Sequence, residues 1–191
     1  MRTVRTNKRG FTLVELMIVV AIVGVLAALA IYGVRRYILN AKTAEARNSI
    51  GQMSKDATTA YNREGMAAAV LTIGASTGIS NRLCNDASNT VPSSIASVKG
   101  QKYQSSPTEW QTGDKDNGWT CLKFSMQDPQ FYMYGYTGGG SDTGGFSASA
   151  SGDLDADGNP STFSIAGTIA SVSNNKVVTV APNIDEVSPD E

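Results

Sequence analysis

The stretch KRGFTLVELMIVVAIVGVLAALAIYGV, residues 8–34, decides the fold of this 191-residue chain. Between Phe11 and Val34 it is apolar almost throughout. As a helix this run would be about 36 Å long, at a rise of roughly 1.5 Å per residue. That length exceeds the roughly 30 Å hydrocarbon core of a bilayer. Residues 11–34 are therefore predicted to form a transmembrane helix.

The segment before this helix, residues 1–10, carries the basic side chains Arg2, Arg5, Lys8 and Arg9 and no acidic one. The positive-inside bias predicts a single-pass orientation with the N-terminus in the cytoplasm, although Arg35 and Arg36 reduce the asymmetry. The alternative is a cleaved secretory signal peptide, for which Ala28-Leu29-Ala30 offers a small-residue cleavage site. Against it, the apolar stretch is longer than a usual signal-peptide core and contains an acid, Glu15.

Glu15 needs a partner, because a carboxylate inside a membrane helix costs about 2.5–3.5 kcal/mol on insertion scales. Residues 8–30 resemble the leader and first helix of the type IV pilins, a resemblance carried by Gly10, Phe11, Glu15 and the apolar helix. It implies that a prepilin peptidase cuts between Gly10 and Phe11 and methylates the new amine of Phe11. It also implies that Glu15 neutralises the Phe11 amine of a neighbouring subunit during filament assembly. A buried carboxylate beside an ammonium group is consistent with that role.

The resemblance extends over residues 1 to about 60, with one departure. Tyr32 stands where many members of the family have a proline, whereas Gly24 matches the family. The family pattern associates the stretch between these positions with unwinding of the helix in the filament. Gly24 and Gly33 each weaken a helix by about 1 kcal/mol relative to alanine, but no proline ring blocks its hydrogen bonds. Whether residues 24–33 unwind is left open.

The helix is predicted to continue as an amphipathic segment, residues 35–63. Apolar residues recur there at helical spacing: Ile38, Ala41, Ile50, Met53, Ala57 and Tyr61. Charged residues occupy the opposite face, which is predicted to meet solvent or neighbouring subunits: Lys42, Glu45, Arg47, Lys55, Asp56 and Arg63. The alternative is two helices separated near Gly33.

Residues 64–191 are predicted to form a globular head. Alternating apolar residues predict a hairpin of strands 119–126 and 130–136, turned at Asp128-Pro129. Further strands are expected at 162–171 and 176–182. An antiparallel sheet of about four strands, packed on the amphipathic half of the helix, would give an α+β fold. Tyr132, Tyr134 and Tyr136 share one strand face, where we expect cross-strand packing rather than a sugar-binding platform.

Three other segments of the head are predicted to lie at the surface. Residues 136–152 are rich in Gly and Ser and are expected to form a mobile loop. The stretch from Trp110 to Trp119 is expected to be an exposed loop. Residues 184–191 contain four acids and are predicted to be a solvated tail.

Composition excludes many kinds of enzyme. The chain has no histidine, which removes His-based catalytic triads and imidazole metal sites. No nucleophile and base pair can be nominated, so no catalytic residue and no enzymatic activity are predicted. The formal net charge of -1 gives no reason to expect specific nucleic-acid binding.

Two small constellations remain. Cys84 and Cys121, the only cysteines, are predicted to form a disulfide, since paired cysteines are usual in exported domains and in pilin heads; two free thiols are the alternative. Asp153, Asp155 and Asp157, followed by a glycine, match the first half of a calcium loop. The bidentate acid that closes such a loop is missing, because Ser164 stands at its twelfth position. The motif is therefore either a weak calcium site, with calcium as the one possible cofactor, or a plain acidic turn.

The function predicted is that of a type IV pilus subunit, of the major kind, polymerised with copies of itself. The resemblance implies storage in the inner membrane, then export into an extracellular pilus used in twitching motility and adhesion. It implies as partners the prepilin peptidase, an assembly platform, ATPases and an outer-membrane secretin. One alternative is a minor pilin or a type II secretion pseudopilin. Another is a membrane-anchored extracytoplasmic binding domain that never polymerises.

Overall fold

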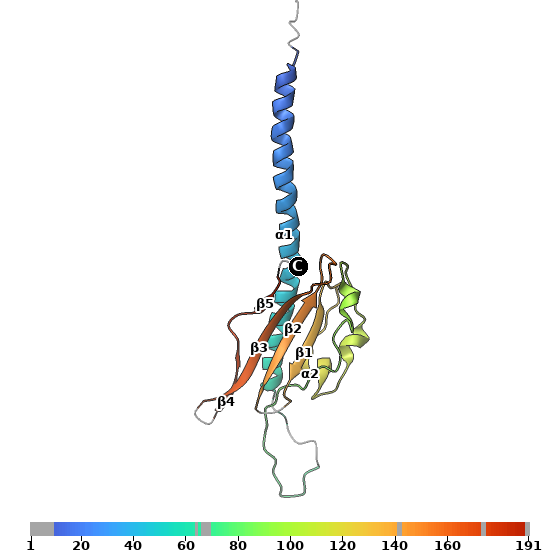
Figure 1. Cartoon of the computed structure of the whole chain (residues 1–191). Coiled ribbons are helices and arrows are strands. Elements are labelled where there is room, and N and C mark those ends of the chain that lie inside the picture. The colour runs from blue at the N-terminus through green and yellow to red at the C-terminus, as the bar shows by residue number, and fades with distance from the viewer. Residues whose placement is uncertain (1–9, 64, 66–69, 141–142, 173–174, 190–191) are drawn as a thin grey trace, which may run out of the picture. The chain divides into compact units, whose positions relative to one another are not determined.

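The computed structural model describes residues 10–189 except 64, 66–69, 141–142 and 173–174. The chain divides into two compact units, Met1–Asn40 and Ala41–Glu191. The first unit contains the N-terminal part of one long helix, and the second contains the rest of that helix together with the head (Figure 1). The predicted α+β architecture, a long apolar N-terminal helix followed by an antiparallel sheet, is confirmed.

The long helix, α1, extends over Leu13–Tyr61, 49 residues. It passes through Gly24 and Gly33 as α-helix, so the alternative of two helices separated near Gly33 is wrong. The predicted end at about Arg63 is confirmed to within two residues.

In the second unit, α1 buries one stripe of side chains. Its members recur every three or four residues, as one face of a helix requires: Thr43, Ala46, Ile50, Met53, Ser54, Ala57, Ala60 and Tyr61. Four of the predicted apolar positions, from Ile50 to Tyr61, belong to this stripe. Ile38 and Ala41, predicted to belong as well, are exposed.

The head contains one antiparallel sheet, whose main strands follow chain order. These are β1 (Met133–Gly138), β2 (Gly145–Gly152), β3 (Ser161–Val172) and β4 (Asn175–Val180). A short fifth strand, β5 (Asp185–Val187), pairs with the beginning of β3. Figure 1 shows β2 and β3 crossing in front of the C-terminal part of α1.

Large and small side chains alternate across the buried face of the sheet. Tyr134 on β1 is opposite Ala150 on β2, which in turn is opposite Phe163 on β3. Four residues away along β2 the order reverses, because Phe146 lies between Gly138 on β1 and Gly167 on β3. A methyl group on Gly167 would lie 2.3 Å from a ring carbon of Phe146, so this position accepts only glycine without a shift of the ring. The three tyrosines of the 130–136 segment are buried, as the cross-strand packing prediction requires.

The prediction of residues 136–152 as a mobile loop is wrong. They include the end of β1 and all of β2, outside 141–142, which the structure does not describe. Composition misled here, since Gly, Ser and Ala are poor strand formers on average. In β2, Ala150 lies between Tyr134 and Phe163, and Ala148 lies between Tyr136 and Ile165, so small residues suit its buried face.

The predicted strand at 119–126 is also wrong. That segment begins with a short helix, α2 (Gly118–Leu122), which ends at Lys123 in the left-handed conformation. Four alternating residues cannot separate a strand from a helical turn followed by a loop. The predicted hairpin turned at Asp128-Pro129 is therefore absent from the described residues, and β1 pairs with β2 instead.

The tryptophans that bound the 110–119 stretch are buried, which corrects its prediction as an exposed loop. Trp110, in the 3-10 helix η2 (Pro107–Gln111), packs edge-on against Trp119 with ring centroids 4.9 Å apart. Trp119 donates its ring N–H to the carbonyl of Asn89, and Phe124 completes the cluster. Within the stretch, Gln111 and the residues around Asp114 are exposed.

Candidate functional site

The first turn of α1 is closed by a reciprocal pair of hydrogen bonds between Thr12 and Glu15. The Thr12 hydroxyl accepts from the Glu15 backbone N–H at 3.2 Å, and Glu15 Oε2 accepts from the Thr12 backbone N–H at 2.9 Å. The Thr12 hydroxyl also donates to the same oxygen. This is a capping box, which satisfies N–H groups that the helix leaves free and fixes the Glu15 carboxylate at its positive end.

Gly10 and Phe11, the predicted processing residues, lie just before this turn. Both are exposed and outside regular secondary structure, and the Phe11 side chain is 87% exposed. The peptide bond between them is thus accessible in the chain as it stands. The four basic residues of the predicted leader, Arg2 to Arg9, lie outside the described residues.

The apolar part of α1 is exposed on all its sides. Every large hydrophobic residue from Leu13 to Val34 is more than half exposed. Among the described residues, α1 is the one helix long and apolar enough to cross a membrane, judged by length and composition. A surface this apolar requires a cover of lipid or protein. At Gly24 and Gly33 an added methyl group would meet no described atom within 4 Å.

In the head, the half-buried carboxylate of Glu45 on α1 is hydrogen-bonded to Phe131 and Tyr134. Its Oε1 accepts from the Phe131 backbone N–H at 2.9 Å and from the Tyr134 hydroxyl at 3.1 Å. Burial raises the pKa of Glu45 above its usual value, against the opposing effect of these two hydrogen bonds. Its prediction as a solvent-facing charge is therefore wrong.

Two further charges of the same predicted face are also engaged within the head. Arg47 forms a two-pronged ion pair with Glu186 of β5, at 2.7 and 2.9 Å. The acidic end is exposed to solvent, as predicted, but as far as Val187 it is a strand paired with β3 and not a free tail. The guanidinium of Arg63 donates to the carbonyl of Cys121 at 2.6 Å.

Two replacements of Glu45 separate the stabilising effect of its hydrogen bonds from the cost of burying its charge. Glu45→Ala leaves the half-buried Phe131 N–H without its acceptor and is expected to lower the free energy of unfolding by about 1–3 kcal/mol. Glu45→Gln keeps an acceptor oxygen and removes the buried charge, so at pH 7 it should match or exceed the wild type. Urea unfolding of the full chain in detergent micelles, followed by tryptophan fluorescence, measures both, with the exposed Lys55→Ala as matched control.

The same pair of proteins gives a pH test. Because the folded pKa of Glu45 is raised above 4.5, the native state binds the extra proton, and stability falls as pH rises through the window above 4.5. Glu45→Gln lacks this component, so its stability advantage should grow across that window. An advantage that shrinks with rising pH would contradict the assigned environment.

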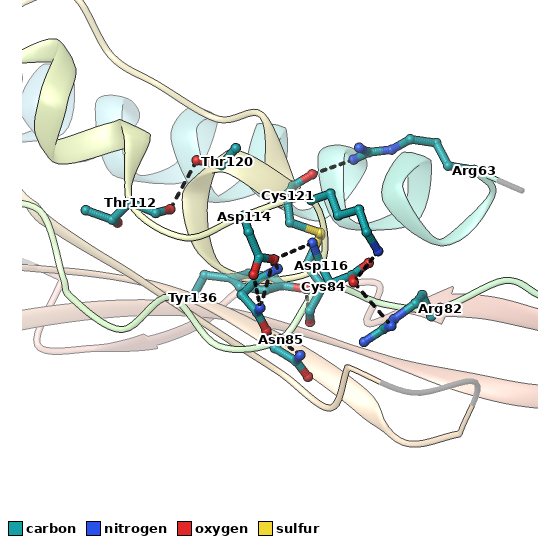
Figure 2. The surroundings of a disulfide bond; sticks show 12 residues. Arg63, Arg82, Cys84, Asn85, Thr112, Asp114, Asp116, Thr120, Cys121 and Tyr136 are labelled. Atoms are coloured by element: carbon teal, nitrogen blue, oxygen red, sulfur yellow. Dashed lines mark hydrogen bonds and ion pairs between the residues drawn. A yellow bond between two sulfur atoms is a disulfide. The ribbon is translucent and has the colours of Figure 1, made fainter. Parts of the chain in front are cut away.

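Cys84 and Cys121 form a disulfide, with Cα atoms 5.8 Å apart (Figure 2). Both residues are buried. The carbonyl of Cys84 accepts from the Tyr136 hydroxyl of β1 at 3.5 Å, and that of Cys121 accepts from Arg63 beyond the end of α1. The disulfide thus lies where α2, the sheet and the end of the long helix meet.

The three candidate calcium ligands are brought together in the loop between β2 and β3. Asp153, Asp155 and Asp157 each offer an oxygen, and these oxygens lie within 4.8 Å of one another. Asp153 is buried, while Asp155 and Asp157 are exposed. The chain folds its acidic motif into a cluster, as a ligand set would require.

Sequence reasoning missed several of these residues. Thr12 carried a readable signal, since Thr-x-x-Glu before an apolar run is a capping-box pattern. Glu45 and Arg47 carried none, because a charge on the polar face of a helix looks the same whether solvent or a strand lies beside it.

Comparison with known proteins finds similarity in the N-terminal segment of the chain. Residues 5–31 match the family model of the prokaryotic N-terminal methylation motif. The chain is 47% identical over 49 residues to the type IV major fimbrial protein FimA of Dichelobacter nodosus, which covers 26% of this chain and 31% of that protein. It is 50% identical over 52 residues to the type IV major pilin protein PilA of Myxococcus xanthus, covering 26% and 24%. It is 46% identical over 56 residues to PilE1 of Neisseria gonorrhoeae, a type IV major pilin, covering 29% and 33%.

These similarities cover a third or less of each relative's length and less than a third of this chain. No solved structure matches the chain. The methylation motif lies at the start of a helix of membrane-spanning length, with Glu15 in the first turn of that helix. In its N-terminal motif and first helix, the chain is thus similar to type IV pilins.

Proposed function

We propose that this chain is the precursor of a type IV pilus subunit of the major kind. A prepilin peptidase cuts it between Gly10 and Phe11 and methylates the amine of Phe11. The mature subunit is held in the inner membrane by residues 11–34, with its head outside the cytoplasm, and is then polymerised into an extracellular filament. The observation that carries this proposal is the combination of the methylation motif with an apolar helix exposed on every side.

Polymerisation follows from that exposed surface. Once the subunit leaves the bilayer, lipid no longer covers the apolar part of α1. This surface is then buried against copies of the same helix. Contacts between different surfaces of identical subunits, when they do not close into a ring, generate a helical filament. Glu15 supplies the specificity, because its carboxylate is stabilised in this apolar surrounding by the methylated Phe11 ammonium of a neighbouring subunit.

The resemblance to type IV pilins supports further partners and uses for the filament. An assembly platform, cytoplasmic ATPases and an outer-membrane secretin drive and pass the filament. Twitching motility and adhesion are its uses. We assign no catalytic step to this chain.

The test is the abundance of the chain in filaments sheared from the cell surface, compared with the membrane fraction. A major pilin is expected to dominate the sheared material. Traces in sheared filaments would instead indicate a minor pilin or pseudopilin, and complete retention in the membrane would indicate an anchored domain. Either outcome would overturn the proposal of a major subunit.

A further inference from the structure

The connection between β2 and β3 brings three carboxylates together, and within the part of the chain that the structure describes one ion pair reaches them. Asp153, Asp155 and Asp157 occupy alternate positions, and Gly158 follows them with φ +102°, a conformation that favours glycine. One cation, the ammonium of Lys99, lies 3.4 Å from Asp153 Oδ2. This single charge leaves the three-carboxylate cluster with an excess of negative charge.

Asp153 supplies the observation that separates this loop from an ordinary acidic turn. Its side chain is only 5% exposed. One oxygen, Oδ2, accepts from the Gly158 backbone N–H at 3.0 Å, but the other, Oδ1, is buried and has no hydrogen-bond partner among the described residues. A buried carboxylate oxygen without a donor is costly, and a bound cation removes that cost.

The backbone of Asp153 is also tethered to a neighbouring segment. The Asp153 backbone carbonyl accepts from the Gly100 N–H at 2.7 Å, just after the 3-10 helix η1 (Ile95–Val98). An ion bound to Asp153 would therefore hold the loop together at a residue that is already bonded to the segment after η1. Stabilisation of the head is the expected consequence.

We propose that residues 153–159 form a calcium site, with the carboxylates of Asp153, Asp155 and Asp157 as its protein ligands. Oxygen donors on a loop suit calcium, which accepts irregular coordination, better than magnesium, which demands a strict octahedron. Because Ser164 replaces the closing acid, we expect a dissociation constant on the order of 10⁻⁴–10⁻³ M, as in extracellular modules. Lys99 competes with the ion for Asp153.

The experiment uses the purified full chain in detergent micelles. Calcium binding is measured by isothermal titration, and the melting temperature is recorded in millimolar calcium, in magnesium and in chelator. Calcium is expected to bind and to raise the melting temperature by a few degrees, and magnesium at the same concentration to have little effect. The double variant Asp155→Asn/Asp157→Asn should lose both effects while still folding, since both side chains are exposed. The matched control is Asp128→Asn, at an exposed acid outside the loop.

A second variant makes the proposal specific to this geometry. Lys99→Gln removes the competing ammonium, so calcium should bind severalfold more tightly than to the wild type. Absence of calcium binding to the wild type, or retention of binding in Asp155→Asn/Asp157→Asn, would overturn the proposal. Unchanged affinity in Lys99→Gln would place the ion away from Asp153. None of these results depends on filament formation, so the calcium site and the pilus function fail or stand separately.

Discussion

Cells that carry Glu15→Ala are expected to yield sheared material without this chain, although the chain still accumulates in the membrane. The carboxylate is the one acidic group in the apolar segment, and its proposed partner is the Phe11 ammonium of the next subunit. Without it, an incoming subunit would leave that ammonium uncompensated in an apolar surrounding, which is strongly unfavourable. Insertion into the membrane does not suffer, since a buried carboxylate costs about 2.5–3.5 kcal/mol there.

Glu15 has a second role in the structure, so the control must separate the two. Its Oε2 closes the capping box with Thr12. Glu15→Gln retains an acceptor for the Thr12 N–H but has no charge, and it should fail to assemble as Glu15→Ala does. Thr12→Ser retains the capping hydroxyl and the charge and should assemble normally. Filaments that contain Glu15→Ala at wild-type levels would contradict the charge-pairing role and favour an anchored domain.

The second large effect is expected from removal of the disulfide. Cys84 and Cys121 are 37 positions apart, and a crosslink across such a loop restricts the unfolded chain enough to contribute about 3–4 kcal/mol. The double variant Cys84→Ala/Cys121→Ala should therefore unfold at clearly lower urea concentration than the wild type. Trp110 and Trp119 report the transition directly, because both are buried in the head.

Reduction of the wild type provides the matched control for this variant. Dithiothreitol should lower the urea midpoint of the wild type and leave the midpoint of Cys84→Ala/Cys121→Ala unchanged. An equal midpoint for oxidised wild type and double variant would show that the crosslink adds nothing to the stability of the head. In that case the hydrogen bonds of Arg63 and Tyr136 to the carbonyls of Cys121 and Cys84 would be enough to stabilise this part of the head.

The parts of the fold that were predicted are those with a strong local pattern. Continuous apolarity from Phe11 to Val34 and helical spacing from Ile50 to Tyr61 each repeat over several turns, so α1 could be placed almost to the residue. The long strand β3 alternates over enough residues to be recognised as well. In these segments local propensity and tertiary packing favour the same structure.

The parts that were missed depend on partners distant in sequence. Ala150 of β2 suits a strand because Tyr134 and Phe163 flank it, and no short window of sequence contains these partners. The burial of Glu45 depends on the Phe131 N–H, 86 positions away. The acidic end forms β5 because β3 offers a free edge there and Arg47 offers a charge.

The central claim, that this chain is processed and assembled as a pilin, is tested most directly by mass spectrometry of its N-terminal peptide. The peptide should be taken from protein sheared from the cell surface and, separately, from the membrane fraction. The account predicts that the peptide from abundant sheared protein begins at Phe11 and carries one methyl group on its amine. A peptide that begins at Ile31, as signal-peptide cleavage would produce, or one that still begins at Met1, would contradict it.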